Sequence, residues 1–338
     1  MKIALIGKPD ADVPALFGAI SGVASSEHRG TRIVTVKVPD PRVDALATIW
    51  NPKKKVYTEV QFLDVSAEAQ ATNTDAMHVL TTCSVVAQVV RAGSAGGDPP
   101  DPLRVINDFT AELILRDQIV VEGRLERMVK AAQKGLERDL LEKLRTHLET
   151  GRPLRTLALD EADRKRLVGF GLASALPLLV VFNVDESKAR SEVDPKVATA
   201  VNEHGGQVLA LSAALEAEIA QLEAADQLAF LAELGVAESA RDRFLRAVNG
   251  LLDLINFLTM GEDECRAWSV RRGAAAPEAA GRIHSDLERG FIRAEVIRFD
   301  DFMELKSEAA CRKAGKQRVE GKDYIVQEGD ILNIRFNV

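Results

Sequence analysis

The chain of 338 residues is long enough for two or three domains, each with its own hydrophobic core. Its 46% hydrophobic and 28% charged residues are typical of a globular protein, and its net charge of −7 argues against a surface that coats nucleic acid. No apolar run approaches the roughly 20 residues of a membrane span. Three scattered cysteines predict neither a disulfide framework nor a zinc site, and the start lacks the shape of a signal peptide, so we expect a cytoplasmic protein.

The first third of the chain alternates between apolar strands and helices. Helices are expected near residues 15–20 and after the turn at residues 39–41. Strands are expected at residues 2–6, 31–38, 57–65 and 84–92. This alternation favours a parallel α/β sheet, in which ligands bind outside the carboxyl ends of the strands.

The segment GKPDADVP, residues 7–14, lies where a phosphate-binding loop would join a strand to a helix. Such a loop has the pattern G-x-x-x-x-G-K-[ST], whose glycine allows close backbone approach, whose lysine reaches the phosphates and whose hydroxyl binds Mg²⁺. Here those three positions hold Asp12, Val13 and Pro14. The sequence therefore predicts the shell of a nucleotide site with its phosphate-binding groups replaced.

The middle of the chain is rich in Leu, Glu, Arg and Lys at helical spacing. Residues 105–149 and 159–169 favour an antiparallel helical hairpin, with TGRP at residues 150–153 as its turn. Two interpretations stay open, a solvated helical insert and an arm that binds a partner. The α/β pattern resumes at residues 175–186 and 205–222, so the hairpin interrupts one α/β domain.

The last part of the chain, from residue 261, predicts a small α+β module of the β-grasp kind. One helix is expected in MELKSEAACRKAG, residues 303–315. Short strands are expected in AWSVRR, FIRAEVIRF, DYIVQ and DILNIRFNV.

Several segments resemble the YchF subfamily of Obg-like translation-factor NTPases. They are VPDPRVDALATI, FNVDE, LSAALEAEIAQL and, above all, RAWSVRRG with the C-terminal GRIHSDLERGFIRAEVI and GKDYIVQEGDILNIRFNV. The resemblance implies a P-loop GTPase-like α/β domain at residues 1–107 and 172–250, an inserted helical hairpin at 108–171 and a C-terminal TGS domain at 261–338. It also implies that the protein binds ATP at least as readily as GTP, hydrolyses the bound nucleotide slowly and associates with ribosomes.

The resemblance gives a divided result at the phosphate loop. Gly7 matches the family, whereas Asp10, Asp12, Val13 and Pro14 replace its working positions. We expect an internally capped loop, because Asp12 is a favoured N-cap whose carboxylate accepts from free helix N–H groups. Lys8 is the basic residue of this loop, and it offers one route by which phosphates could still be held.

The base-recognition end resembles the family more closely. Asn183, Val184 and Glu186 match its N-x-x-E signature, and the loop Ser212, Ala213 and Ala214 matches the segment that closes over the base. An alternative is that Asn183 and Ser212 only hold loops together, since both are good turn residues. Asp64 matches the Walker B aspartate, or else caps a turn at its strand end, and the switch glycine three residues later is Ala67. Thr31 and Thr35 are weak candidates for the switch threonine.

Four residues of the C-terminal module are candidates for contact with RNA or a protein partner. They are Arg282, His284, Arg289 and Arg293. His284 is better explained as a hydrogen-bonded loop residue than as a catalyst.

The sequence thus predicts a non-hydrolysing binding or regulatory protein linked to ribosomes, translation or stress response. One alternative is a slow ATPase or GTPase that retains weak nucleotide binding through Asn183 and Glu186, with Asp10, Asp12 or Asp64 as a substitute ligand for Mg²⁺. Another is a structural partner protein. No catalytic residue and no metal site are predicted. The only cofactor considered is ATP or GTP, bound weakly. The expected partners are the ribosome, RNA or a translation-related protein, and neither a membrane nor DNA is expected.

Overall fold

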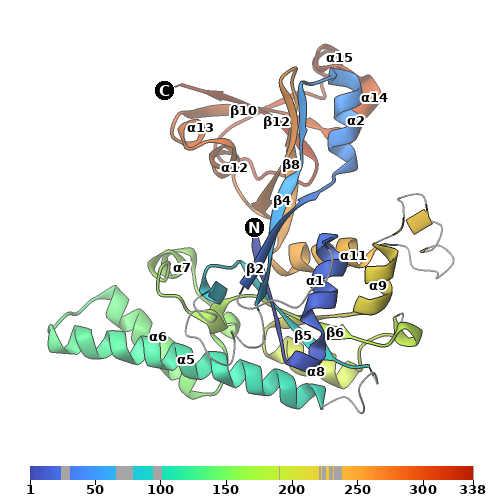
Figure 1. Cartoon of the computed structure of the whole chain (residues 1–338). Helices are drawn as coiled ribbons and strands as arrows, with labels where there is room; N and C mark the ends of the chain where they lie inside the picture. Colours follow the sequence, from blue (N-terminus) through green and yellow to red (C-terminus); the bar gives the residue numbers. More distant parts are fainter. Residues whose placement is uncertain are drawn as a thin grey trace. The chain divides into compact units, whose positions relative to one another are not determined.

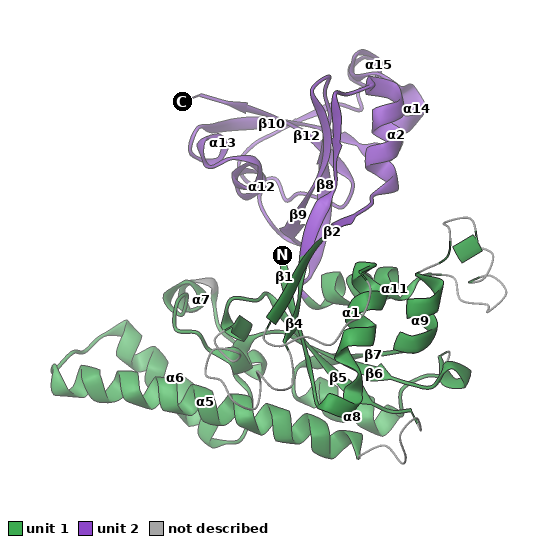
Figure 2. Ribbon diagram, viewed as in Figure 1, with its two compact units in different colours: residues 1–35, 61–251 green, residues 36–60, 252–338 purple. Residues whose placement is uncertain are grey.

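A computed structural model describes residues 1–23, 31–65, 79–93, 101–189, 191–220, 222, 226–227, 231 and 238–337 (Figure 1). The chain divides into two compact units, residues 1–35 with 61–251 and residues 36–60 with 252–338 (Figure 2). Among the described residues, no helix is both long and apolar enough to cross a bilayer.

The first unit is built on a six-stranded sheet with the order β2-β4-β1-β5-β6-β7. Parallel pairs join β1 to β4 and β5, β5 to β6, and β6 to β7. Six of the seven residues of β5 are buried, as expected for a strand covered on both faces. The strands are β1 (Lys2–Gly7), β2 (Thr31–Val38), β4 (Thr58–Val65), β5 (Val85–Arg91), β6 (Leu178–Asn183) and β7 (Gly206–Leu211).

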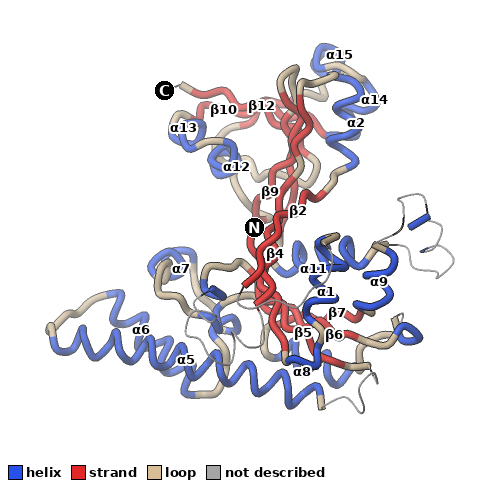
Figure 3. The backbone as a smooth tube through the Cα atoms, viewed as in Figure 1, coloured by secondary structure: helices blue, strands red, loops and turns tan. Residues whose placement is uncertain are grey.

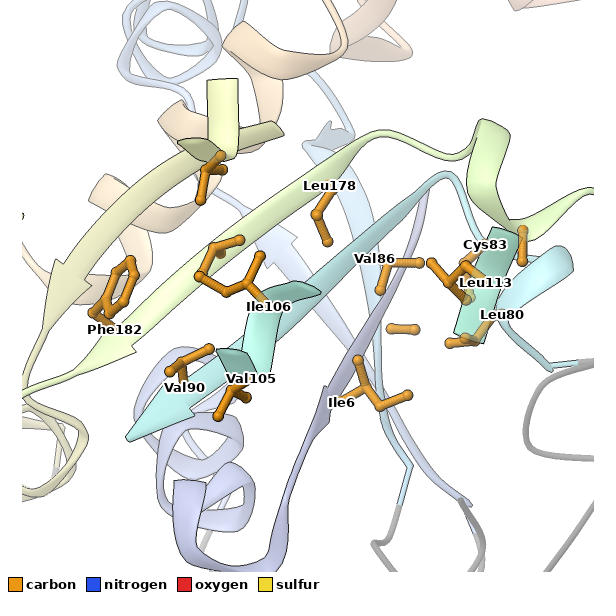
Figure 4. Close-up of a cluster of buried hydrophobic side chains, with 14 of the residues drawn as sticks. Ile6, Leu80, Cys83, Val86, Val90, Val105, Ile106, Leu113, Leu178 and Phe182 are labelled. Carbon is orange, nitrogen blue, oxygen red and sulfur yellow. The ribbon is translucent and has the colours of Figure 1, made fainter. Parts of the chain in front are cut away.

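Helices pack against this sheet through apolar side chains. Phe62 of β4 packs edge-to-face on Phe244 of α11, with ring centroids 5.8 Å apart. Ile6, Val86 and Val90 form another cluster with Val105 and Ile106 of α5 (Figure 4). The helices are α1 (Val13–Ser21), α8 (Pro195–Glu203), α9 (Ala213–Ile219), α11 (Ala240–Leu251) and the α5–α6 pair described next.

Helices α5 (Pro102–Lys130) and α6 (Leu136–Glu149) form a hairpin with its own apolar core (Figure 1). The predicted turn at residues 150–153 is wrong, because the chain reverses at residues 131–135 instead. There Ala132 adopts φ 49°, a left-handed conformation typical of the residue after a helix end, and Gly135, with φ 120°, is the N-cap of α6. TGRP ends α6 and leads through 3₁₀ turns at Leu154–Thr156 and Ala173–Ala175, with α7 (Glu161–Arg166) between them.

A buried carboxylate fastens this hairpin to the body of the first unit. Asp117 of α5 is fully buried and accepts hydrogen bonds from Ala173 N at 2.9 Å, Ser174 N at 2.8 Å and Ser174 Oγ at 2.6 Å. Arg155 adds a bond from its Nε to the His204 carbonyl at 2.7 Å. Burial lowers the pKa of Arg155 to about 10 and raises that of Asp117.

Three of the described helices, α2 (Pro41–Trp50), α5 and α8, begin with the same dipeptide, Asp-Pro. Asp40, Asp101 and Asp194 each accept a hydrogen bond from the backbone N–H two residues later, and a proline fills the first helical position. An Asp N-cap satisfies a free N–H group, and proline at this position has none to satisfy. These starts fix where α2, α5 and α8 begin.

The second unit combines two distant parts of the chain in one sheet, ordered β11-β10-β12-β8-β9-β3. Figure 3 draws β9, β10 and β12 of this sheet in red. Strand β3 (Lys54–Val56) pairs parallel with β9, and α2 (Pro41–Trp50) adds Val43 and Leu46 to a core shared with Cys265 and Phe302. The remaining elements are β8 (Leu254–Thr259), β9 (Glu264–Arg271), α12 (Ala276–Ile283), α13 (Ser285–Arg289), β10 (Phe291–Arg298), α14 (Phe299–Leu305), α15 (Glu308–Lys313), β11 (Arg318–Glu320) and β12 (Asp330–Phe336).

Two expectations for this unit are wrong in detail. The single helix of residues 303–315 is split into α14 and α15, because Lys306 has φ 61° and Ser307 caps the second helix. The expected strand DYIVQ makes one isolated bridge, Ala275 to Ile325. Asp330 holds that segment as a turn instead, by accepting hydrogen bonds from the Tyr324 hydroxyl at 2.6 Å and from Gln327 N at 2.9 Å.

Candidate nucleotide-binding site

The loop that follows β1 turns tightly and bonds to itself. Its 3₁₀ turn, Pro9–Ala11, is closed by Ala11 N donating to the Lys8 carbonyl at 3.0 Å. Asp12 then adopts φ 56°, ψ 51° and becomes the N-cap of α1, where its Oδ1 accepts from Ala15 N at 3.3 Å. Prolines at residues 9 and 14 have no N–H to offer a phosphate. The N–H groups of Ala11 and Ala15 are bonded within the loop, so they do not point freely at a phosphate either.

Val13 fills the interior of the loop at the position of the family's lysine. Its side chain is 5% exposed, and its Cγ2 lies 2.9 Å from where a Cβ of Gly7 would stand. The same Cβ would lie 2.8 Å from the Val89 carbonyl oxygen, so only glycine fits at residue 7. An apolar contact therefore occupies the inside of this loop.

The three carboxylates named as substitutes for the lost Mg²⁺ ligand already have partners. Asp10 pairs with Arg91 Nε at 3.2 Å, and Asp12 caps α1. Asp64, 1% exposed, is 3.3 Å from Arg32 Nη2, and the Arg32 guanidinium lies 4.2 Å from the centre of the Phe17 ring. The described residues consequently do not fit the octahedral, carboxylate-and-hydroxyl site that Mg²⁺ prefers.

Asn183 links the two loops that the sequence assigned to opposite ends of a nucleotide. Its Nδ2 donates to the Ala11 carbonyl at 3.1 Å, and its Oδ1 accepts from Ala213 N at 3.0 Å. Ser212 caps α9 through a long bond, Leu215 N to Oγ at 3.5 Å. These contacts are those of residues that hold loops together, which was one of the two interpretations offered above.

The two loops line one cavity of about 490 Å³ at the carboxyl ends of β5 and β6. The sequence named Asp10, Asp12, Asn183, Val184, Glu186, Ser212 and Ala214 among its lining residues. It missed Arg91, Gly93, Asp185 and Ser187. The one sequence signal for Arg91 is its place at the end of the apolar strand β5, and its position opposite Asn183 emerges only from the β5–β6 register.

Lys8 lies in a different cavity, of about 140 Å³, beside the first turns of α5. Its neighbours there include Gln88, Asp108 and Glu112. Gln88 donates from Nε2 to the Val105 carbonyl at 3.2 Å. Lys8 therefore does not line the cavity that holds the base-recognition loop.

The switch residues are only partly described. Ala67 lies outside the described residues. Thr35 accepts a bond from Gln61 Nε2 at 3.4 Å, and Gln61 pairs with Lys2 at the start of β1. Thr35 is thus at the end of β1 opposite to the phosphate loop.

The C-terminal candidates fall into two groups. His284 accepts at Nδ1 from Asp286 N at 3.2 Å, and Asp286 also pairs with Arg289. Arg282 is exposed on α12. Arg293 lies opposite Arg335 in the β10–β12 register, and Glu295 binds Arg335 with two contacts of 3.1 Å. The hydrogen bond from Arg335 lowers the pKa of Glu295, and the positive charges of Arg335, Arg312 and Arg293 add to this effect.

Comparison with known proteins identifies the relatives of this chain. The Ribosome-binding ATPase YchF of Haemophilus ducreyi is 36% identical over 100% of this chain and 99% of its own length. The chain belongs to the YchF family. The Bacillus subtilis Ribosome-binding ATPase YchF is 34% identical over 99% of this chain, and the family model YchF-GTPase_C, described as a protein of unknown function (DUF933), matches residues 254–337.

A solved structure extends the YchF relationship to the fold. The Schizosaccharomyces pombe YchF GTPase superposes with a TM-score of 0.81, at 26% identity, over 99% of this chain and 97% of its own. The predicted family and the predicted α/β fold are therefore confirmed, and the chain carries a C-terminal YchF domain; that this domain is a TGS domain stays a prediction.

Proposed function

We propose that this YchF-family chain binds ribosomes and acts as a binding or regulatory protein that does not hydrolyse nucleotide. The observation that carries the proposal is the phosphate loop, in which Val13 is buried against Gly7 and Asp12 caps α1. A working loop needs a lysine, a hydroxyl and free N–H groups at these positions. Here the lysine and hydroxyl are replaced, and N–H groups of the loop are bonded internally.

Charge also opposes a triphosphate in this loop. At an effective dielectric constant of about 20, two like unit charges 5 Å apart repel by about 3 kcal/mol. Asp10 and Asp12 both line the cavity, and the guanidinium of Arg91 is paired with Asp10. A triphosphate would therefore meet the carboxylates of Asp10 and Asp12, with no lysine among the described lining residues to offset its charge.

The proposed partner is the ribosome, in line with the relatives' name, ribosome-binding ATPase. Two surfaces are proposed for this contact, the α5–α6 hairpin and the arginine-bearing face of the C-terminal unit, which we propose to be a TGS domain. Arg293 and Arg335, side by side on neighbouring strands, support the second surface, since paired arginines suit RNA phosphates. The boundaries 1–107 with 172–250, 108–171 and 261–338 remain our proposed functional division, as does a cytoplasmic location.

The test compares the natural chain with a variant carrying Asp12→Gly, Val13→Lys and Pro14→Ser. We expect the natural chain to sediment with ribosomes whether or not ATP is present, and to release no phosphate from ATP or GTP above the buffer rate. The triple variant restores the lysine, hydroxyl and glycine, so it should gain Mg²⁺-dependent nucleotide binding in a filter assay.

The control is Asp194→Gly, which removes the matching N-cap of α8, whose carboxylate accepts from Lys196 N at 2.8 Å. It reproduces the lost cap without touching the loop. Steady Mg²⁺-dependent turnover by the natural chain would refute the proposal, and absence from the ribosomal pellet would refute its partner.

A further inference from the structure

The cavity keeps the residues that match the family's base-recognition loop, whereas the loop that matches its phosphate-binding segment now carries Asp10 and Asp12. Its volume of about 490 Å³ falls within the range of small-molecule pockets, roughly 300–1,000 Å³. The Asn183 side chain ties its two ends together, through the Ala11 carbonyl and Ala213 N. The pocket is thus held in shape by contacts that need no phosphate.

The charged side chains among the described lining residues are mostly acidic. Asp10, Asp12, Asp185 and Glu186 contribute four carboxylates, against one guanidinium, that of Arg91. Arg91 Nε is itself 3.2 Å from Asp10 Oδ2, so that pair is close to neutral. The remaining charge favours ligands that bring N–H and O–H donors and disfavours anions.

The acids come from two loops that line the pocket. Asp185 and Glu186 follow β6, in the base-recognition segment, and an Asp185 carboxylate oxygen lies 2.5 Å from where a Cβ of Gly93 would stand. Asp10 and Asp12 belong to the loop after β1, which matches the family's phosphate loop in position. A ligand that spans the pocket meets hydrogen-bond acceptors at its base and again where its phosphates would begin.

We propose that this cavity binds an uncharged nucleoside, base and ribose without phosphates, and that it does so without Mg²⁺. Carboxylates of the β6 loop accept the N–H groups of the base, and Asp10 or Asp12 accepts the 5′ hydroxyl. The inference rests on the proposed loss of phosphate binding. It adds that the replaced loop has reversed the site's preference between nucleosides and nucleotides.

The experiment is calorimetric titration of the full chain with adenosine, guanosine, their 5′-monophosphates and their triphosphates, in EDTA and again with Mg²⁺. We expect the preferred nucleoside to bind roughly tenfold or more tightly than its triphosphate, with the monophosphate between them, and Mg²⁺ to leave the nucleoside unaffected. Asp10→Asn with Asp12→Asn keeps a good N-cap, removes two charges and should bring the two affinities closer together. Glu186→Gln should weaken the nucleoside roughly tenfold, whereas Lys188→Gln, exposed in the same 3₁₀ turn and not lining the cavity, should not.

The possible failures separate this inference from the proposed function. Tighter, Mg²⁺-dependent binding of the triphosphate would overturn both. No binding of nucleoside at millimolar concentration would overturn the inference alone, because ribosome binding without hydrolysis does not depend on it. Equal affinity of the natural chain for nucleoside and triphosphate would also overturn it.

Discussion

Asn183 shows how a single side chain can hold the shape of a pocket. Its amide donates to the loop after β1 and accepts from the start of α9, so it joins two segments that are far apart in the chain. Neither bond requires a ligand. The shape of the pocket is therefore compatible with our proposal that Val13 and Pro14 replace groups that bind phosphate.

Tyr324 provides a residue-scale prediction about pH. Burial first, and then its hydrogen bond to Asp330, raises the pKa of Tyr324 to about 12. A raised pKa favours the neutral phenol in the folded state, so its contribution to stability is present below about pH 10 and is lost as the pH rises toward 12. The absorbance of tyrosinate at 295 nm should accordingly show half-titration of Tyr324 near pH 12.

The same titration can be isolated cleanly, since the chain has two tyrosines. Tyr57→Phe leaves Tyr324 as the single signal, and Asp330→Asn in that background should lower its pKa toward the value of free tyrosine. Half-titration near pH 10 in the folded Tyr57→Phe chain would contradict the prediction.

The replacements in the phosphate loop could be found from the sequence, because the glycine, the lysine and the hydroxyl residue each have a fixed position in a short motif. Arg91 was missed for a physical reason, whereas Asp185 lies inside the N-x-x-E motif and was only overlooked. The role of Arg91 depends on which strands are neighbours, and the register that sets it opposite Asn183 joins segments separated by the whole hairpin. Local patterns carry no information about that pairing.

At the scale of elements, the α5–α6 hairpin shows where local reading fails. Helix lengths follow from apolar spacing, but the reversal lies in AAQKG, where the alanines favour helix and only Gly135, the N-cap of α6, interrupts it. TGRP carries stronger turn residues and attracted the prediction. The α/β elements were easier, because their buried strands are short apolar runs bounded by polar turns.

Asp117 is the element-scale test of how the hairpin is fastened. Asp117→Ala would leave the N–H groups of Ala173 and Ser174 buried without their acceptor, so we expect a loss of roughly 3 kcal/mol or more in the free energy of unfolding. Urea denaturation followed by circular dichroism measures it. Glu126→Ala, exposed on the same helix, is the matched control and should change stability by no more than about 0.5 kcal/mol.

A loss at Asp117 equal to that at Glu126 would mean that the carboxylate network contributes nothing to the attachment. The secondary structure of α5 should survive in both variants, since its N-cap at Asp101 is untouched.

At the scale of the whole molecule, the second unit is assembled from residues 36–60 and 252–338. Sequence alone placed residues 36–60 with the N-terminal strands, because they follow them without a linker signal. The structure packs Leu46 of α2, fully buried, into the same core as Cys265 and Cys311. Cys83 belongs to the core of the first unit.

Buried thiols therefore report on each unit separately. Leu46→Ala should cost about 2–5 kcal/mol and make Cys265 and Cys311 react with a thiol reagent at least tenfold faster in dilute urea, with Cys83 unchanged. Ile106→Ala, in the core that contains Cys83, should give the reverse pattern. Mass spectrometry of the labelled peptides distinguishes the sites, and equal acceleration of all three thiols by Leu46→Ala would contradict the prediction.

The split origin of the second unit also bears on how the chain is made. During synthesis α2 and β3 emerge early, but their partners in the sheet, β9 and the strands beyond it, are translated only after residues 61–251. The apolar face of α2 is therefore without its packing partners during that interval. A fragment limited to residues 254–337 would have the opposite defect, because it would lack β3, which pairs with the edge of β9, and α2, which completes the core.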